Sequence, residues 1–239
     1  MTTRAAIVTG ASSGIGLAIA RVLAQEGHAV TMHGRREEKL DAAVRSLAAE
    51  GFEVSSVAGN VAEEDAVREL VAAHERRYGR LDVLVNNAGV GMGQAAGEIV
   101  TRHLDTQLAV NLRALILCYR EAMPLLERAG TQDGALVINT ASITGKRGVP
   151  WLSVYSATKH GIVGYTESMN KELATRGIRS CALCPAFVDT AMTDFIKGEV
   201  APAEMITAAD VAEGVRFLLR LSHRCVVPEI IFERPGAET

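Results

Sequence analysis

The sequence has few cysteines, no long hydrophobic run and no excess of positive charge. Four cysteines in 239 residues are too few for a disulfide scaffold, which favours a reducing compartment. No segment approaches the ~18 uninterrupted apolar residues of a membrane-spanning helix, and the apolar stretch after Arg4 is too short for a signal peptide. A formal charge of -3 offers no basic surface to nucleic acid or to a membrane. We therefore expect a soluble, cytoplasmic protein without a nucleic-acid or membrane partner.

The sequence also has no compact set of metal ligands. Its six histidines are scattered and form no H-E-x-x-H motif. Cys181 and Cys184 do form a C-x-x-C, but they lie in the strand-like run "IRSCALCPA". An odd offset sends two strand side chains to opposite faces of a sheet, so we expect buried thiols rather than a redox or zinc site. No catalytic metal is predicted.

Short apolar runs alternate with longer amphipathic stretches from one end of the chain to the other. The predicted strands are 5–9, 29–33, 53–57, 82–86, 135–139, 179–184 and 227–232. The predicted helices, with apolar residues recurring at three and four, are 14–26, 36–50, 63–78, 101–129, 152–176 and 207–221. This alternation predicts an α/β fold: a doubly wound, Rossmann-type parallel sheet of about seven strands with helices on both faces. No linker interrupts it, so residues 1–239 are predicted to form a single domain. Only 187–206 lacks periodicity, which is typical of a lid or of a poorly ordered loop.

The first predicted strand ends in "TGASSGIG", residues 9–16, which leads directly into a helix. Gly10, Gly14 and Gly16 would let the backbone approach a pyrophosphate closely, and the helix N-terminus would offer it free N–H groups. The position after the first strand of a doubly wound pattern makes this turn a predicted dinucleotide site.

The end of the second predicted strand favours NADP over NAD. An acidic residue there would accept a hydrogen bond from a free 2′-hydroxyl, whereas this chain has Gly34 followed by Arg35 and Arg36. Arg35 is the first choice for a 2′-phosphate and Arg36 the second. The alternative is that both arginines only open a solvated helix and pair with Glu37 and Glu38.

Tyr155 and Lys159 lie four positions apart in "VYSATKHG" and would share one face of a helix. Such a pair is often only a tyrosine packed on a lysine stem. It can also be chemical, because an ammonium together with a cationic oxidised nicotinamide would lower the phenol pKa from its usual ~10. Ser142 closes the predicted strand "ALVIN", where a parallel sheet presents its ends to a ligand.

Several motifs occur in order and together resemble the short-chain dehydrogenase/reductase family. They are "TGASSGIG" (9–16), "NNAG" (86–89), Asn111 in "LAVNL", Ser142 in "INTAS", Tyr155 and Lys159 in "YSATK", and "CPAFVDT" (184–190). The resemblance runs from about residue 5 to the last strand. Members of this family are NADP(H)- or NAD(H)-dependent oxidoreductases, commonly dimers or tetramers, so a homo-oligomer is expected.

The resemblance implies four catalytic residues. Tyr155 would be the general acid and base, and Lys159 would tune it and bind the nicotinamide ribose. Ser142 would hold the substrate oxygen and stabilise the developing alkoxide. Asn111 would fix a water that contacts the lysine and completes a proton relay.

The same resemblance implies a set of cofactor contacts beyond the two arginines. They are Gly10, Ser12, Ser13, Gly14, Ile15, Gly16, Asn60, Val61, Asn87, Ala88, Gly89, Tyr155, Lys159, Pro185, Val188 and Thr190. The chain departs from the family pattern at Asn60, where relatives commonly have aspartate, and at Ala186, where they have glycine. The tail "VPEIIFERPGAET" lacks the usual Thr-Gly and Asp-Gly-Gly, which puts contacts of the last strand in doubt.

The expected activity is an NADP(H)-dependent interconversion of a small ketone or aldehyde and its alcohol. Beside Ser142 and Tyr155, the substrate contacts are predicted to be Val149, Trp151, Met192 and Phe195, with Met92 and Phe187 as further candidates. Lys146 and Arg147 could attract an anionic substrate, or could simply be solvated. The alternative function is a non-catalytic NADP(H)-binding regulatory or scaffold protein on the same fold.

Overall fold

Seven parallel strands form the centre of the protein in a computed structural model, which describes residues 4–198 and 200–236. Their spatial order is β3 (Val54–Ala58), β2 (Ala29–Gly34), β1 (Ala5–Thr9), β4 (Val83–Asn86), β5 (Ala135–Thr140), β6 (Ile178–Pro185) and β7 (Glu229–Phe232). The strand order reverses between β1 and β4, which is the place where doubly wound sheets bind ligands at the carboxyl ends of their strands. All seven predicted strands are confirmed within a few residues, and the last begins at Glu229 rather than at 227.

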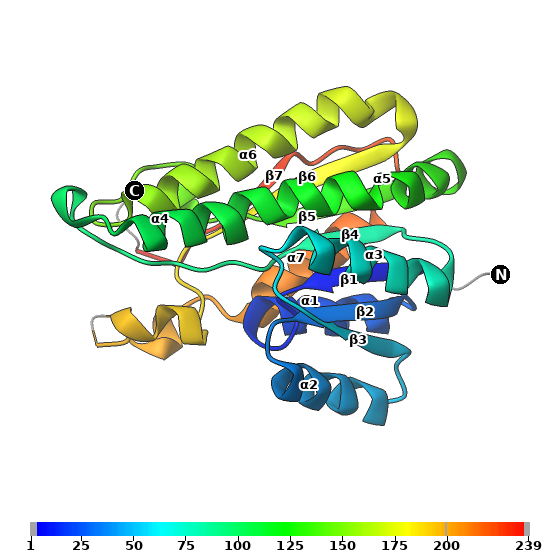
Figure 1. The fold of residues 1–239 in the computed structure, drawn as a ribbon, viewed down its shortest axis with the longest axis horizontal. Helices are drawn as coiled ribbons and strands as arrows, with labels where there is room; N and C mark the ends of the chain where they lie inside the picture. Colours follow the sequence, from blue (N-terminus) through cyan, green and yellow to red (C-terminus); the bar gives the residue numbers. More distant parts are fainter. Residues whose placement is uncertain (1–3, 199, 237–239) are drawn as a thin grey trace.

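Helices cover both faces of this sheet (Figure 1). One face packs against α1 (Gly14–Gln25), α2 (Glu37–Ala49) and α7 (Ala208–Arg220). The other face packs against α3 (Glu64–Tyr78), α5 (Ala114–Gln132) and α6 (Ser153–Leu173), with α4 (Thr101–Gln107) leading into α5. The central strands are buried on both sides, which explains why their sequences are continuous apolar runs rather than alternating ones.

The two cysteines of the C-x-x-C pair are buried on opposite faces of the sheet. Cys181 packs in the core on the α1 side, and Cys184 packs in the core on the α6 side. Burial raises the pKa of Cys181 to about 12 and that of Cys184 to about 11, so both remain neutral thiols. The prediction of buried thiols on opposite faces is confirmed.

The predicted helix 101–129 is divided in three. Between α4 and α5, residues Leu108–Arg113 form a π-helical segment, and α5 continues to Gln132. Periodicity at three and four does not reveal the extra residue that a π-bulge inserts, and such bulges often occur at functional sites.

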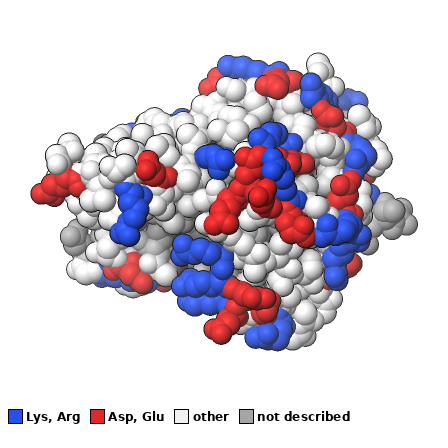
Figure 2. All heavy atoms as spheres, viewed as in Figure 1, with Lys and Arg blue, Asp and Glu red and all other residues white. Residues whose placement is uncertain are grey.

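The 187–206 segment forms two short 3₁₀ helices, Ala191–Ile196 and Pro202–Glu204, with Glu199 outside the described residues. It projects from the carboxyl end of the sheet (gold in Figure 1). None of the described helices is both long enough and apolar enough to cross a membrane. On the face that carries α3 and α5, acidic and basic groups intermingle (Figure 2).

Candidate active site

The glycine-rich turn between β1 and α1 needs its glycines for two different reasons. Gly10 and Gly14 adopt φ of 65° and 55°, in the left-handed region that favours glycine. Gly16 has no room for a side chain, since a Cβ there would lie 2.3 Å from the carbonyl oxygen of Gly10. The N-cap residue of α1, Ser13, makes no side-chain capping bond, so the first N–H groups of the helix stay available to an anion. The turn has the form that a pyrophosphate requires.

Asn87 clamps this turn to the neighbouring strand ends. Its Nδ2 donates to the carbonyl oxygens of Thr9 at 3.1 Å and Gly10 at 3.3 Å, and its Oδ1 accepts from the Thr140 hydroxyl at 3.2 Å. Its side chain is therefore engaged inside the protein. This leaves the backbone of residues 87–89 as the part that could contact a cofactor.

Arg35 and Arg36 follow β2 directly, and both are exposed. Neither forms an ion pair with any residue of the ranges 4–198 and 200–236, so the acidic residues that open α2 do not neutralise them. Gly34 lies against the turn, because a Cβ there would be 3.5 Å from the Ser12 side chain. Two guanidinium groups without an ion-pair partner among the described residues thus follow a strand end that lies against the glycine-rich turn.

Asn60 and Val61 form the loop after β3, and both use their side chains locally. Asn60 accepts from the N–H of Ala62 at 3.2 Å and donates to Glu63 at 3.1 Å, while Val61 packs into the core. The amide at position 60, where relatives commonly have aspartate, therefore shapes the loop and is already engaged within it.

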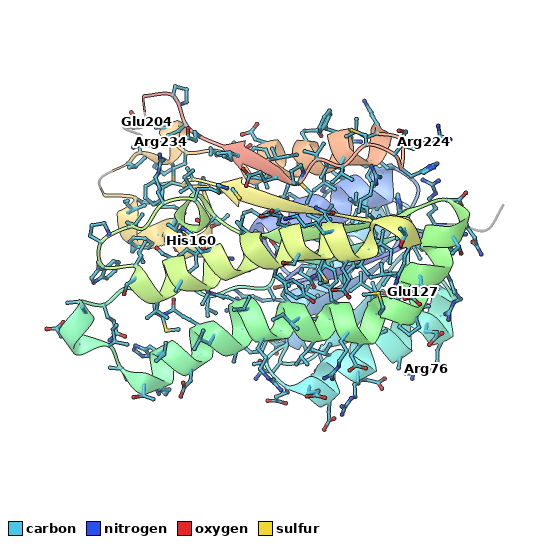
Figure 3. The ribbon with its side chains drawn as sticks, turned by 90° about the horizontal axis from the view of Figure 1, so that it is seen from above. Arg76, Glu127, His160, Glu204, Arg224 and Arg234 are labelled. Carbon is cyan, nitrogen blue, oxygen red and sulfur yellow. The ribbon has the colours of Figure 1, made fainter. Side chains whose placement is uncertain are left out.

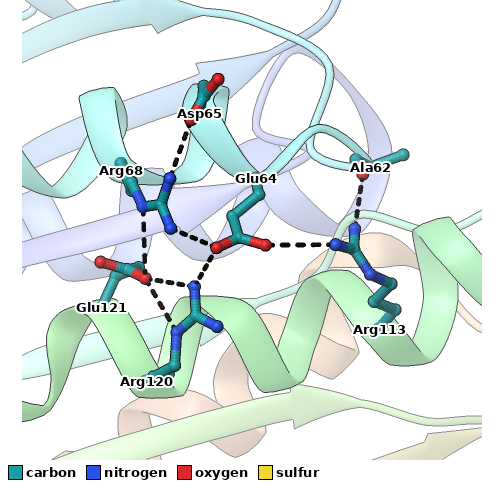
Figure 4. A network of polar contacts seen from close by, with 7 residues as sticks. All are labelled: Ala62, Glu64, Asp65, Arg68, Arg113, Arg120 and Glu121. Carbon is teal, nitrogen blue, oxygen red and sulfur yellow. Dashed lines mark hydrogen bonds and ion pairs between the residues drawn. The ribbon is translucent and has the colours of Figure 1, made fainter.

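An ionic network fixes this loop to the helices beside it (Figure 4). Glu64 pairs with Arg68, with Arg120 at 2.6 Å and with Arg113 at 3.3 Å. Arg113 also donates to the carbonyl oxygen of Ala62 at 3.0 Å. Since Arg113 ends the π-helical segment, the network joins the loop after β3 to the segment that carries Asn111.

The structure brings Ser142, Tyr155 and Lys159 together at the carboxyl end of β5. Ser142 caps the 3₁₀ turn Ile143–Gly145 by accepting from the N–H of Thr144 at 3.2 Å, and its hydroxyl lies beside the Tyr155 phenol. Lys159 Nζ lies 5.4 Å from the centroid of the Tyr155 ring. The side chains of Tyr155 and Lys159 share one face of α6, as their spacing predicts.

Burial is the largest influence on the pKa values of Tyr155 and Lys159. Burial raises the pKa of Tyr155 to about 12, against the lowering effect of the neighbouring Ser142 side chain, and it lowers the pKa of Lys159 to about 8. The predicted lowering of the phenol pKa requires a cationic oxidised nicotinamide as well as the ammonium, so it stays a prediction for the cofactor complex. In the protein alone, the loss of hydration of the phenolate outweighs the lowering effect of Ser142. Tyr155 is a neutral phenol at pH 7.

Asn111 is held in the π-helical segment by a pair of hydrogen bonds to Val90. Its Oδ1 accepts from the Val90 N–H at 2.8 Å, and its Nδ2 donates to the Val90 carbonyl oxygen at 2.9 Å and to Thr158 at 3.1 Å. This answers why an amide is tolerated in the middle of a helix. Beside it is a cavity of about 10 Å³, at the lower limit for one water, which Asn86 also lines. The Oδ1 of Asn86 is buried and has no partner among the described residues.

Two exposed aromatic rings, those of Trp151 and Phe195, lie close to each other. Trp151 and Phe195 have ring centroids 6.0 Å apart and exposed fractions of 54% and 60%. Trp151 has φ of 69°, a strained value for a bulky residue, and its ring covers Gly93 so closely that a Cβ there would lie 2.2 Å away. Met192 is also exposed, whereas Val149, Met92 and Phe187 are half-buried.

The segment 187–206 is tied together at its base. Val188 pairs with Ile206, the N–H of Asp189 donates to Ile206 at 2.9 Å, and the N–H of Ile206 donates to Phe187 at 3.0 Å. Thr190 touches the glycine-rich turn, since a Cβ on Gly14 would be 3.1 Å from it. The first and last residues of the segment are thus held together by backbone hydrogen bonds.

The strand end before this segment is also well held. Ser142 donates to the carbonyl oxygen of Pro185 at 3.4 Å, and the N–H of Ala186 donates to Phe232 at 2.9 Å. Alanine fits here without strain because position 186 has no positive φ. β7 therefore pairs with β6 although the tail lacks the usual glycines.

Lys146 and Arg147, which follow β5 and Ser142 in the chain, both form ion pairs with carboxylates of the protein. Lys146 binds Glu229 at 2.7 Å and Arg147 binds Glu233 at 2.9 Å. Both bridges reach the C-terminal strand and the residues just after it. Their charge is compensated, which removes the basis for an anionic substrate at these two positions.

Sequence reasoning missed Thr140, Thr158 and Gly93. The carbonyl of Thr140 accepts a hydrogen bond from Lys159, Thr158 supports Asn111, and Gly93 receives the Trp151 ring. These contacts join residues that are distant in the chain or involve backbone atoms, so no local sequence pattern predicts them.

Comparisons with known proteins agree with this geometry. A family model described as short chain dehydrogenase matches residues 4–200. The 3-oxoacyl-acyl-carrier-protein reductase FabG of Staphylococcus aureus is 35% identical over an alignment of 226 residues that covers 90% of this chain and 90% of that one. The solved actinorhodin polyketide ketoreductase, a phenylalanine-to-tryptophan variant with NADPH, superposes with a TM-score of 0.87 at 33% identity, covering 96% of this chain and 95% of that one.

A solved alcohol dehydrogenase from the archaeon Thermococcus sibiricus, complexed with 5-hydroxy-NADP, gives a TM-score of 0.89 at 29% identity, covering 99% of this chain and 98% of that one. The family model spans most of the sequence. Its match includes strands β1 to β6, the glycine-rich turn and the cluster of Ser142, Tyr155 and Lys159. The chain belongs to the short chain dehydrogenase family.

Proposed function

We propose that this oxidoreductase interconverts a ketone or aldehyde and its alcohol with NADP(H), using Tyr155 as general acid and base. The observation that carries the proposal is the Tyr155 phenol beside the Ser142 hydroxyl and the Lys159 ammonium. They lie at the same edge of the sheet as the glycine-rich turn.

The residues at this edge fit NADP(H). The uncapped N-terminus of α1 suits a pyrophosphate, and the unpaired Arg35 and Arg36 suit a 2′-phosphate. Pro185, Val188 and Thr190 would border the nicotinamide end, since Thr190 touches Gly14. When bound, the nicotinamide supplies or accepts a hydride. Two solved relatives carry NADPH or a hydroxylated NADP, which supports this choice.

The protein residues supply the proton. In the reductive direction, Ser142 would hold the carbonyl oxygen and Tyr155 would donate its proton to that oxygen. A phenol with a pKa of about 12 is fully protonated at pH 7, which suits an acid. Lys159, with a pKa of about 8, is mostly charged at pH 7 and would stabilise the phenolate that remains. Asn111 would position the water that returns a proton.

The substrate is proposed to be uncharged and moderately apolar. Met192 and Phe195 on the closed loop 187–206 would act as a lid, with Val149 and Trp151 on the other side of the mouth. Lys146, Arg147 and Lys197 are all paired with carboxylates, so no free cation among them would attract an anion.

We also propose a cytoplasmic homo-oligomer, a dimer or a tetramer. Support comes from exposed apolar side chains on α7 and β7, namely Phe217 and Ile231, and on the α4–α5 helical run, namely Leu108 and Ile116. β7 is moreover an edge strand, which can pair with another chain.

The proposal is tested by mixing the protein with NADPH and then with NADH. Absorbance of the reduced nicotinamide is followed across aldehydes, diketones, oxo-esters and cyclic ketones. We expect NADPH to be consumed with a few of these compounds. Tight NADPH binding without turnover on any compound, and with Tyr155→Phe indistinguishable from the wild type, would favour the non-catalytic binding protein.

A further inference from the structure

A polar cavity lies at the amino ends of the strands, at the edge of the sheet opposite to Tyr155. Its volume is about 240 Å³, and it lies between the starts of β4, β5 and β6 and the turn that follows α7. In Figure 3, Arg224 marks this turn, at the other end of the molecule from Glu204 and Arg234. Pockets for drug-sized ligands measure roughly 300–1,000 Å³, so this cavity suits a smaller molecule.

Both acidic groups of the cavity, Asp82 and Asp133, are engaged by Arg80, whose single positive charge balances one of the two carboxylates. Asp82 is buried, and its carboxylate accepts from the Ala5 N–H at 2.8 Å and from Arg80 at 2.9 Å and 2.5 Å. Asp133 lies 3.6 Å from the same guanidinium. Every described carboxylate that lines the cavity is therefore engaged by Arg80.

Two further arginines line the cavity and have no carboxylate partner. Arg4 makes no ion pair within the described ranges. Arg179 donates from Nη1 to the carbonyl oxygens of Ser222 and Cys225, both at 3.0 Å, while its Nε is buried without a partner. Burial lowers the pKa of Arg179, which remains charged but is poorly solvated. A buried N–H of a cation without an acceptor is a costly arrangement that an oxyanion would correct.

His28 adds an acceptor to this cationic pair. Its Nδ1 lies 3.2 Å from the carbonyl oxygen of Leu23, which can only accept, so the proton of the neutral ring is on Nδ1. Nε2 is then a bare acceptor. Burial lowers the pKa of His28, and the nearby Arg4 acts in the same direction, so the ring stays neutral at pH 7. A neutral imidazole can accept a hydrogen bond from a hydroxyl group.

We propose that this cavity binds a small molecule carrying a phosphate group. The phosphate oxygens would accept from Arg4 and Arg179, and a hydroxyl group of the ligand, which in inorganic phosphate is the P–OH of the hydrogen phosphate dianion, would donate to Nε2 of His28. The rest of the 240 Å³ would take a substituent of a few atoms, beside Leu219 and Leu221. The site is separate from the proposed NADP(H) site, because it lies at the opposite ends of the strands.

The test is calorimetric titration of the NADPH-saturated protein with inorganic phosphate at constant ionic strength. Saturation with NADPH keeps phosphate away from Arg35 and Arg36. We expect saturable binding that Arg4→Gln weakens by at least about tenfold, the scale of one charged hydrogen bond. Arg45→Gln is the matched control, because Arg45 is an exposed, unpaired arginine on α2, and this variant should bind like the wild type.

Arg179→Lys is a second variant, which keeps the charge and removes Nε. It should also weaken phosphate binding, and its unchanged circular dichroism and NADPH affinity would show that the turn after α7 is intact. Absence of saturable phosphate binding, or equal weakening by Arg4→Gln and Arg45→Gln, would overturn the proposal. If acetate at equal concentration displaces phosphate, the ligand of the cavity is a carboxylate, and the assignment to a phosphate is wrong.

Discussion

Lys159 donates a hydrogen bond from Nζ to the backbone carbonyl oxygen of Thr140 at a distance of 2.7 Å. The bond ties the first half of α6 to the last residue of β5. Ser142 lies two residues beyond Thr140, and Tyr155 lies one helical turn before Lys159. The backbone of β5 and one lysine thus set the distance between the hydroxyl and the phenol.

The first prediction concerns the phenol itself. Tyr155→Phe should lower turnover by a factor of about 10² to 10⁴, the usual contribution of a general acid, because only the proton donor is removed. NADPH affinity, measured by fluorescence titration, should change little. Tyr165→Phe is the control, since Tyr165 is on the same helix and makes its ring contact with Tyr119. Retained turnover in Tyr155→Phe would remove the tyrosine from the mechanism.

The second prediction concerns cofactor choice. Arg35→Asp should reduce NADPH affinity by about 10- to 100-fold, because a charged hydrogen bond to phosphate of ~1.5–3 kcal/mol is lost and a like charge is introduced. NADH affinity should rise or stay constant. Both are measured as dissociation constants, with Arg45→Asp as a control for net charge. An unchanged ratio of the two constants would assign the 2′-phosphate to Arg36 or to neither arginine.

The fold could be predicted almost completely from the sequence. The central strands are buried on both faces of the sheet, so each one is a continuous run of apolar residues that is easily recognised. The shared helix face of Tyr155 and Lys159 followed from their spacing, and the position of Ser142 followed from the strand pattern, whereas the grouping of the three came from the family resemblance. The π-helical segment around Asn111 could not be predicted, because its cause is the pairing of Asn111 with Val90 across the fold. The raised pKa of Tyr155 could not either, because desolvation depends on packing that the motif "YSATK" does not contain.

The third prediction concerns stability in acid. His33 and His74 are buried, and burial lowers the pKa of each to about 4. The unfolded chain binds protons at these rings near pH 6.5, whereas the folded chain does so only near pH 4. The free energy of unfolding should therefore be constant above pH 6.5 and fall towards pH 4, by at most about 1.4 kcal/mol per pH unit for each ring.

His33 can be separated from the other titrating groups by substitution. Both of its ring nitrogens are buried without a partner, so His33→Leu should cost little at pH 7.5. Urea denaturation at pH 7.5 and pH 5 should show a smaller loss of stability in His33→Leu than in the wild type. Equal losses would mean that His33 is protonated in the folded protein at pH 5.

The last prediction concerns the glycine-rich turn. Gly16→Ala places a Cβ 2.3 Å from the Gly10 carbonyl oxygen and 2.5 Å from Asn87 Nδ2. The backbone at Gly10 and the side chain of Asn87 must both shift to accept this Cβ. We expect a loss of about 1–3 kcal/mol in the free energy of unfolding, as for other overpacked sites, together with a large loss of NADPH affinity. Gly164→Ala is the matched control, because Gly164 lies in α6 with nothing within 4 Å of an added Cβ. It should be neutral or stabilising by up to ~1 kcal/mol, as expected for alanine in a helix. Equal stability and equal NADPH binding in the two variants would show that the turn opens freely, and the close approach of Gly16 to Gly10 would then have no role in holding a pyrophosphate.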